Sequence, residues 1–238
     1  MGRKTRTVNR AKVKLDNSIL RSVYNDIPEA YDRANRFISF YMDVRWRAEL
    51  IVRALHHSKK PRRVLDVGAG RGELSYVLGK ISPGPREIVM LDYAENMLET
   101  ALVEGERVLA SFEALPFREK CFDLVMSSFA LHAADDVEVV VKEMKRVSGG
   151  VVAVIAMGKP EDSLRRLYLS VYLRFVMPYL AALMGAKTED FKYIYYIYRR
   201  LPTNSFFREV MSRHLELKVY EERALRLFYF LVGEPKGD

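Results

Sequence analysis

Residues 62–75 read R-R-V-L-D-V-G-A-G-R-G-E-L-S. The apolar run Val64–Val67 is typical of a buried parallel strand, and Glu73–Lys80 has the composition of a helix. Three glycines stand between these two segments at every second position: Gly68, Gly70 and Gly72. Glycine lets the chain reverse sharply and leaves bare backbone that a ligand can approach closely. The stretch therefore predicts a strand, a tight ligand-binding turn and a helix.

A second strand follows, with an acid at its end. Residues 88–98 read I-V-M-L-D-Y-A-E-N-M-L, so Asp92 comes directly after the apolar run Ile88–Leu91. An acidic residue there, about twenty residues after a glycine turn, is positioned to accept hydrogen bonds from ribose hydroxyls. The two strands together therefore predict a nucleoside site.

Two details indicate which nucleoside is bound. The spacing is G-x-G-x-G, whereas dinucleotide-binding turns have G-x-G-x-x-G. Asp66 stands two residues before the first glycine, where its carboxylate would repel a pyrophosphate and attract an ammonium group. S-adenosyl-L-methionine (AdoMet) has an ammonium, a sulfonium and a ribose but no phosphate. The stretch therefore resembles the nucleotide-binding motif of class I AdoMet-dependent methyltransferases, and a dinucleotide is the disfavoured rival.

Strands and helices continue to alternate along the chain. Strands are predicted at 107–110, 122–128 and 151–156, with helices at 95–104 and 137–147. This alternation predicts an α/β fold with a doubly wound, mostly parallel sheet, in which the ligand lies beyond the carboxyl ends of the strands. Acids and serines fall at those ends: Asp66, Asp92, Ser111 and Ser127–Phe129.

After the fifth strand the sequence predicts a helical insertion over about 161–213. Leu215–Tyr220 and Leu225–Val232 are then expected to pair antiparallel at the far edge, which makes a seven-stranded sheet. The segment 161–185 is unusually apolar, but a charge and a proline interrupt it, and a membrane span needs about twenty predominantly apolar residues. Two interpretations stay open for it and for the tyrosine-rich segment 190–200: ordinary core, or a lid over a lipophilic substrate.

Composition bounds the remaining possibilities. With 238 residues, of which 49% are hydrophobic, the chain can build the core of one large domain at 62–238. The net charge is +8, and residues 1–15 are expected to form a basic, disordered tail. Residues 16–61 are predicted to be a helical cover, with helices at 16–29 and 44–55. The single cysteine fits a reducing compartment, and the scattered histidines predict no metal site.

A closer resemblance lies before the glycine turn. Residues 23–47 read V-Y-N-D-I-P-E-A-Y-D-R-A-N-R-F-I-S-F-Y-M-D-V-R-W-R. This segment is similar to the N-terminal signature of the ubiquinone/menaquinone biosynthesis C-methyltransferases at Tyr31, Asp32, Asn35, Ser39 and Trp46. The stretches E-A-L-P-F, F-D-L-V and S-S-F-A-L resemble the loop and fourth strand of the same family. The resemblance extends over about residues 22–213.

The resemblance implies particular contacts with AdoMet. Arg71 would lie in the glycine loop, Asp92 on the ribose and Ser128 below the methionyl part, with Ser111 and Phe112 beside the adenine. The whole predicted cofactor site is Asp66, Gly68, Ala69, Gly70, Arg71, Gly72, Asp92, Tyr93, Met97, Ser111, Phe112, Ser128 and Phe129. On the acceptor side we expect Tyr31, Tyr172 and Tyr193.

Several residues depart from the pattern of that family. Arg71 stands where threonine is usual, Ser111 where asparagine or aspartate is usual, and His132-Ala133 where Arg-Asn is usual. The final strand pattern also differs, over 223–228. These changes are compatible with the cofactor, since Phe112 can compensate for the shorter Ser111 by stacking, and they bear mainly on the identity of the acceptor.

Methyl transfer from a sulfonium is an in-line displacement, so the enzyme must mainly align the reactants and exclude water. If the acceptor is a hydroquinone-type ring, its carbon becomes nucleophilic when a neighbouring phenol loses a proton, and a general base then helps. His132, which follows the fourth strand, is the candidate base, with a packing or surface histidine as the alternative. Asp32, from the N-terminal cover, is a further candidate residue of the catalytic site, where it would shape the site.

We therefore expect AdoMet-dependent C-methylation of a lipophilic quinone-precursor ring. The protein is expected to be cytoplasmic, with peripheral contact to the inner face of the membrane as an open alternative. RNA methylation, motivated by the basic tail, is disfavoured because no aromatic residues interleave with those charges. Another small-molecule acceptor and a non-catalytic AdoMet-binding role also stay open. The oligomeric state is not predicted.

Overall fold

The computed structural model describes residues 42–58, 60–84, 86–183 and 188–237, without the side chains of 181 and 188–193. Several predictions therefore lie outside the described residues: the tail 1–15, the helix 16–29, and the site residues Tyr31 and Asp32.

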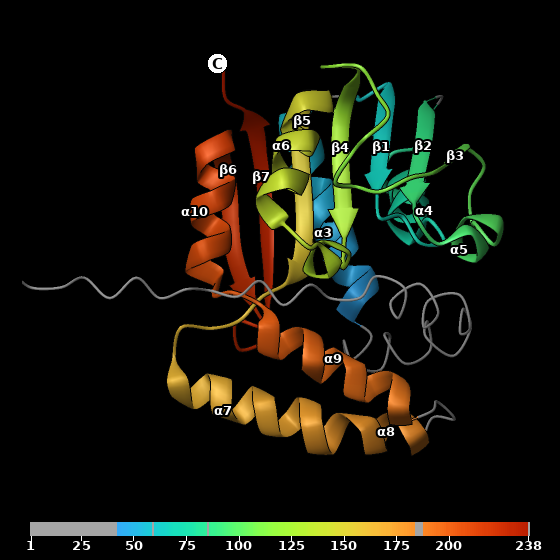
Figure 1. The fold of residues 1–238 in the computed structure, drawn as a ribbon. Coiled ribbons are helices and arrows are strands. Elements are labelled where there is room, and N and C mark those ends of the chain that lie inside the picture. The colour runs from blue at the N-terminus through green and yellow to red at the C-terminus, as the bar shows by residue number, and fades with distance from the viewer. Residues whose placement is uncertain (1–41, 59, 85, 184–187, 238) are drawn as a thin grey trace, which may run out of the picture.

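Within the described residues, a seven-stranded sheet forms the centre of the protein (Figure 1). The strands are β1 (Arg63–Val67), β2 (Glu87–Asp92), β3 (Glu106–Leu109), β4 (Phe122–Ser128), β5 (Ser148–Met157), β6 (Leu215–Arg223) and β7 (Phe228–Pro235). Their spatial order is β3-β2-β1-β4-β5-β7-β6. The first five strands are parallel, and β7 runs antiparallel to both β5 and β6. The predicted doubly wound, mostly parallel sheet is confirmed, and the strand order reverses between β1 and β4, where ligands bind in such sheets.

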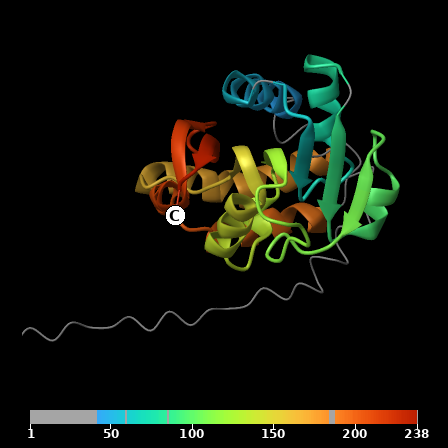
Figure 2. The ribbon, with the colours of Figure 1, turned by 90° about the horizontal axis from the view of Figure 1, so that it is seen from above.

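Helices cover both faces of the sheet. They are α3 (Met42–His57), α4 (Glu73–Ile81), α5 (Glu95–Glu99), α6 (Val137–Val147), α7 (Ser163–Val171), α8 (Met177–Leu183), α9 (Thr188–Arg200) and α10 (Asn204–His214), with a 3₁₀ turn η1 (Leu131–Ala133) and a π-helical segment η2 (Tyr172–Val176). Figure 2 shows α3 and α4 on one face of the sheet and α6 on the other. The helix predicted at 44–55 is confirmed as α3. Its buried side includes Trp46, whose ring lies 5.2 Å from that of Phe228 on β7.

Strand β5 begins three residues earlier and β6 ends three residues later than predicted, and two further differences have a visible local cause. Helix α5 ends at Glu99 instead of 104, because the Thr100 hydroxyl donates to carbonyls of the last turn and the Leu102 N–H bonds to the Arg71 carbonyl. Strand β7 begins at Phe228 instead of Leu225, because residues 224–226 all have positive φ and form the tight turn after β6. Both differences come from hydrogen bonds and turn geometry that apolar periodicity does not encode.

The helical insertion lies beyond the carboxyl ends of the parallel strands (Figure 1). Helices α7, α8 and α9 pack on one another there, whereas α10 packs against α6 and β6, so it belongs to the sheet layer. Among the described residues, no helix is both long enough and apolar enough to cross a membrane.

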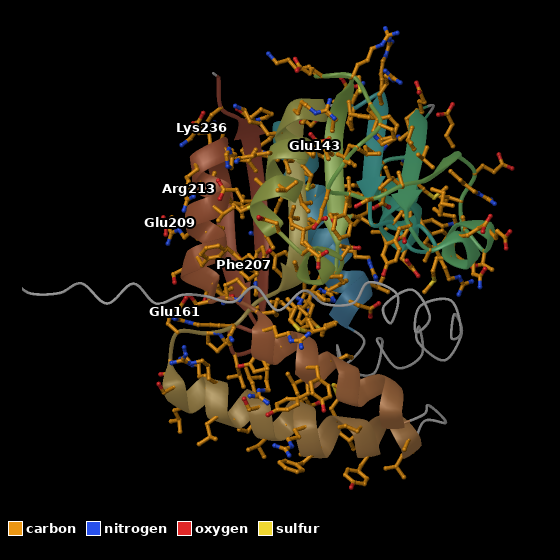
Figure 3. All side chains as sticks on the ribbon, in the orientation of Figure 1. Glu143, Glu161, Phe207, Glu209, Arg213 and Lys236 are labelled. Atoms are coloured by element: carbon orange, nitrogen blue, oxygen red, sulfur yellow. The ribbon has the colours of Figure 1, made fainter. Side chains whose placement is uncertain are left out.

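Both ends of the insertion are fixed to the turn between β6 and β7. Buried Asn204 donates from its side chain to the Arg226 carbonyl at 2.8 Å, and its backbone N–H donates to the Lys159 carbonyl at 2.9 Å. Glu161, which lies where the chain leaves the sheet (Figure 3), accepts from the Ser205 N–H at 2.7 Å. The insertion is therefore anchored at its base.

Candidate cofactor site

The glycine turn after β1 has the left-handed backbone that its sequence predicts. Gly68, Gly70 and Gly72 have φ values of +65°, +57° and +77°. A Cβ on Gly68 would lie 2.4 Å from the Cβ of Ala130, and one on Gly72 would lie 2.7 Å from the sulfur of Met90. Glycine at the first position is therefore required for packing, and the positive φ favours glycine at all three positions. A Cβ on Gly70 would meet only Glu73 Oε2, at 3.7 Å, so a ligand can approach the backbone there.

The carboxylate of Asp92 connects the ends of β1 and β2. Its Oδ2 accepts from the Gly70 N–H at 2.8 Å and its Oδ1 accepts from the Ala94 N–H at 2.9 Å. Burial raises the pKa of Asp92 above its usual value, although these N–H donors, with that of Tyr93, act to lower it. Since a carboxylate oxygen can accept more than one hydrogen bond, Asp92 keeps the capacity to bind ribose hydroxyls.

Asp66 lies behind the turn and does not line the cavity. Its Oδ2 accepts from the N–H and the hydroxyl of Ser75 at 3.2 and 2.7 Å, which holds the first turn of α4 against β1. Its Oδ1 is buried without a hydrogen-bond partner, and burial raises the pKa of Asp66 to about 7. In this geometry Asp66 supports the loop, whereas the sequence analysis expected it to attract the ammonium group of the cofactor.

A charged pair on α3 completes the wall on the side of β4. Arg47 Nη1 donates to Asp43 at 2.8 Å, and the two side chains are only 12% and 9% exposed. Arg47 Nε donates to the Ser128 hydroxyl at 3.2 Å, and its guanidinium carbon lies 5.0 Å from the centre of the Phe129 ring. The pair therefore fixes the Arg47 guanidinium beside the carboxyl end of β4, with its charge balanced by Asp43.

These groups enclose a cavity of about 420 Å³ at the strand ends. Most predicted cofactor residues line it: Gly68, Ala69, Gly70, Arg71, Asp92, Tyr93, Met97, Phe112, Ser128 and Phe129. The remaining lining residues were not predicted: Asp43, Val44, Arg47, Glu73, Tyr76, Val77, Ala94, Leu102, Ala130 and Ala133. The structure thus brings together residues from the ends of β1, β2 and β4 and from helix α3.

Two of the predicted cofactor residues besides Asp66 are not in the lining. Gly72 starts α4 and packs on Met90. The Ser111 hydroxyl accepts from the Glu113 N–H at 3.2 Å, so it organises the loop after β3, while its neighbour Phe112 is buried against the cavity. Of these two neighbours, only the Phe112 ring contributes to the wall of the cavity.

Neither His132, the predicted base, nor Tyr172, a predicted acceptor residue, lines the cavity. Although part of His132 reaches solvent, its Nδ1 is buried without a hydrogen-bond partner, and burial lowers the pKa of the ring to about 4. Its neighbours Ala130 and Ala133 line the cavity, but His132 does not. Tyr172 is partly buried in η2 and packs on the core. Tyr193 belongs to α9, and its side chain lies outside the description.

One pattern in the sequence indicates the Asp43–Arg47 pair, although neither residue was among the predicted site residues. Asp43 and Arg47 are four residues apart in a segment predicted to be helical from 44 onward, which is the spacing of a helical ion pair. The contact of Arg47 with Ser128 could not be predicted in the same way, because these two residues are 81 positions apart in the sequence. Among the described residues, no group of three or more His, Cys, Asp or Glu side chains could hold a metal ion.

The polar and apolar groups that line the cavity fit AdoMet. Asp92 suits the ribose, Phe112 offers an apolar wall for the adenine, and open backbone at Gly70 allows a close approach. Of the two arginines in the described lining, Arg71 lies in the glycine loop, and its Nε donates to the Thr100 carbonyl at 3.3 Å. The site thus offers an acceptor for ribose hydroxyls and an apolar surface for a purine base.

Comparison with solved structures agrees with this fold. An AdoMet-dependent methyltransferase from Thermotoga maritima superposes with a TM-score of 0.62 at 18% identity, over 91% of this chain and 100% of that one. A protein from Pyrococcus horikoshii superposes with a TM-score of 0.56 at 19% identity, over 83% of this chain and 96% of that one. Fold and site define a class I AdoMet-dependent methyltransferase.

The family follows from the sequence. The model of the ubiE/COQ5 methyltransferase family matches residues 11–222, and the chain belongs to that family. A demethylmenaquinone methyltransferase of Thermus thermophilus is 33% identical over 181 residues, which are 72% of this chain and 81% of that protein. A demethylmenaquinone methyltransferase of Staphylococcus aureus is 31% identical over 180 residues, 72% of this chain and 74% of that protein.

Proposed function

We propose that the protein transfers the methyl group of AdoMet to a ring carbon of a lipophilic quinone precursor. The relatives named above support this acceptor class, since they are demethylmenaquinone methyltransferases. The observation that carries the proposal is the wall beside Ser128, where the ring of Phe129 and the guanidinium of Arg47 lie together. An aromatic ring with ionisable oxygens matches such a combination of an aromatic surface and a cation.

When bound, AdoMet supplies an electrophilic methyl group on a sulfonium. The residues of this chain hold and orient the reactants. Asp92 and the glycine turn fix the nucleoside, since they are bonded to each other through the Gly70 N–H. Phe112 and Phe129 provide apolar surface that keeps water from the reacting atoms.

In this proposal Arg47 acts on the acceptor. A cation close to a phenolic oxygen lowers the pKa of that oxygen, and the resulting negative charge makes the neighbouring ring carbon nucleophilic. Asp43 holds Arg47 in position through the ion pair at 2.8 Å. Ser128 accepts from Arg47 Nε, so the guanidinium is fixed from two sides.

The reaction also needs a base, because the ring carbon that takes the methyl group gives up its hydrogen as a proton when the ring regains its aromatic form. His132, the base expected from the sequence, stays a prediction. Its Nδ1 is buried without a partner, and a ring whose pKa is lowered to about 4 is a poor base near neutral pH. Asp32, the other residue expected in the catalytic site, lies outside the described residues.

A lipophilic acceptor partitions into bilayers, so the proposal includes peripheral contact of the protein with a membrane face. The test uses purified protein with methyl-labelled AdoMet, presented in parallel with a prenylated 1,4-naphthoquinol, with total lipid extract and with total RNA. Label in the organic phase, lost in Asp92→Ala, is the expected result. Label in RNA, or AdoMet binding without transfer to any of these acceptors, would refute the proposal.

A further inference from the structure

The outermost helices of the insertion carry an apolar stripe on their exposed side. Leu167, Phe175, Tyr179 and Leu183 are 62%, 54%, 69% and 83% exposed, and Val171 completes the row. These residues follow one another at intervals of four, from α7 through η2 into α8. Leu164 and Tyr168 widen the stripe at its start. Large apolar side chains in one contiguous exposed row indicate an interaction surface.

The other side of the same helices is packed in the core. Leu169, Leu173 and Met177 are also spaced by four, and they are buried in the main hydrophobic cluster. In a regular α-helix a four-residue step overshoots the turn of 3.6 residues, so such a row would drift around the axis. The π-helical segment Tyr172–Val176 has wider turns, which reduces the drift and keeps the two rows on opposite sides.

The surface lies at the end of the molecule where the cofactor cavity opens. The parallel strands point their carboxyl ends toward the insertion, and α9 lies between the sheet and helices α7 and α8 (Figure 1). A partner that covers the stripe would therefore sit on the same end of the protein as the site of methyl transfer.

Charge identifies the partner. Residues 163–183 contain three arginines, Arg165, Arg166 and Arg174, and no acidic residue. The guanidinium of Arg174 lies 5.0 Å from the ring centre of Phe175, beside the stripe. A second copy packed on the same stripe would bring a second set of these arginines to the interface, with no acidic residue of 163–183 to pair with them, which like charges oppose. Aromatic and leucine side chains flanked by arginines are instead the composition of a helix that lies in the surface of an anionic bilayer.

We propose that the stripe Leu167–Val171–Phe175–Tyr179–Leu183 docks the protein on an anionic lipid bilayer. The inference extends the proposed function and depends on it for its role in methylation. If the acceptor is dissolved in the bilayer, docking would deliver it beside the cavity. The docking itself depends only on the stripe and its arginines.

The test is sedimentation of the full-length protein with vesicles, without AdoMet or acceptor. Vesicles of phosphatidylglycerol and phosphatidylcholine in equal parts are compared with pure phosphatidylcholine. We expect wild-type binding to the anionic vesicles, weakened about tenfold or more in the double variant Phe175→Asp/Tyr179→Asp. The matched control is Val52→Asp, an equally exposed apolar position (56%) on helix α3, which should bind within about twofold of wild type.

Two further measurements separate a loss of lipid binding from a loss of folding or of methyl transfer. Circular dichroism and S-adenosylhomocysteine affinity should be unchanged in the double variant, which shows that it is folded. Methylation of a short-chain acceptor dissolved in buffer should also be unchanged. Docking on lipid would be overturned if wild type failed to bind anionic vesicles, or if the double variant bound them as tightly as wild type. It would also be overturned if wild type were a dimer and the double variant a monomer. Vesicle binding without methylation of any quinol would instead count against the proposed function alone.

Discussion

The N–H of Gly70 donates a hydrogen bond of 2.8 Å to the carboxylate of Asp92, so the turn after β1 is bonded to the end of β2. Each of the two groups that are expected to hold the nucleoside thereby positions the other. Removing the carboxylate should disturb both the ribose contact and the backbone of the loop.

For Asp92→Ala we expect AdoMet affinity to fall tenfold or more, because hydrogen bonds to a charged group contribute about 1.5–3 kcal/mol. Asp92→Asn should lose less, since its amide oxygen can still accept from the Ala94 N–H. The control is Glu87→Gln, at the opposite end of the same strand. Isothermal titration with AdoMet and with S-adenosylhomocysteine measures the effect, and an unchanged affinity in Asp92→Ala would remove this residue from the site.

Arg47→Gln tests whether the cation acts on the acceptor. A nearby positive charge lowers the pKa of an acid by about one to three units, so kcat should fall roughly ten- to a thousandfold. The affinity for S-adenosylhomocysteine should stay within about twofold of wild type. Arg53→Gln, on the same helix but paired with Glu221 away from the cavity, is the matched control. If cofactor affinity drops and kcat is kept, Arg47 serves the carboxylate of the cofactor instead.

Much of the fold was readable because it depends on local patterns. The apolar runs that end in Asp66 and Asp92 predicted two neighbouring parallel strands, and the glycine spacing predicted the turn between β1 and α4. The carboxyl ends of parallel strands meet at one edge of a sheet, so the position of the cavity followed from topology alone.

The side-chain directions at the site were less accessible to prediction. Asp66 faces Ser75 instead of the cavity, which depends on the pleat of β1 relative to α4. His132 turns inward because Leu131–Ala133 form a 3₁₀ turn. The contact of Arg47 with Ser128 needs the packing of α3 on the sheet, which no local sequence pattern specifies.

Asp66 and His132 make opposite contributions to the pH dependence of stability. Burial raises the pKa of Asp66 to about 7, so the folded state holds its proton more tightly, and stability is lost as pH rises from about 4 to about 7. Burial lowers the pKa of His132 to about 4, so stability is lost as pH falls from about 6.5 to about 4. Each effect is on the order of 3–4 kcal/mol, and in wild type the two should nearly cancel.

Urea unfolding at pH 4.5, 5.5, 6.5 and 7.5 should expose each contribution separately. In Asp66→Asn the free energy of unfolding, relative to wild type, should increase with pH over this range. In His132→Asn it should decrease with pH. Glu106→Gln, at an exposed position on β3, is the control variant. Parallel pH profiles for wild type and both variants would show that neither group titrates as its burial implies.

Gly158 and Asn204 should be energetically coupled at the base of the insertion. A Cβ on Gly158 would lie 1.9 Å from Asn204 Oδ1, so Gly158→Ala should displace that side chain and cost about 1–3 kcal/mol of unfolding free energy. Asn204→Ala loses the bond to the Arg226 carbonyl, at a cost of about 1–3 kcal/mol. In the double variant the alanine at 204 makes room for the new methyl group, so the combined cost should be smaller than the sum by about 1 kcal/mol. Strict additivity in urea unfolding would mean that the two residues do not share this contact.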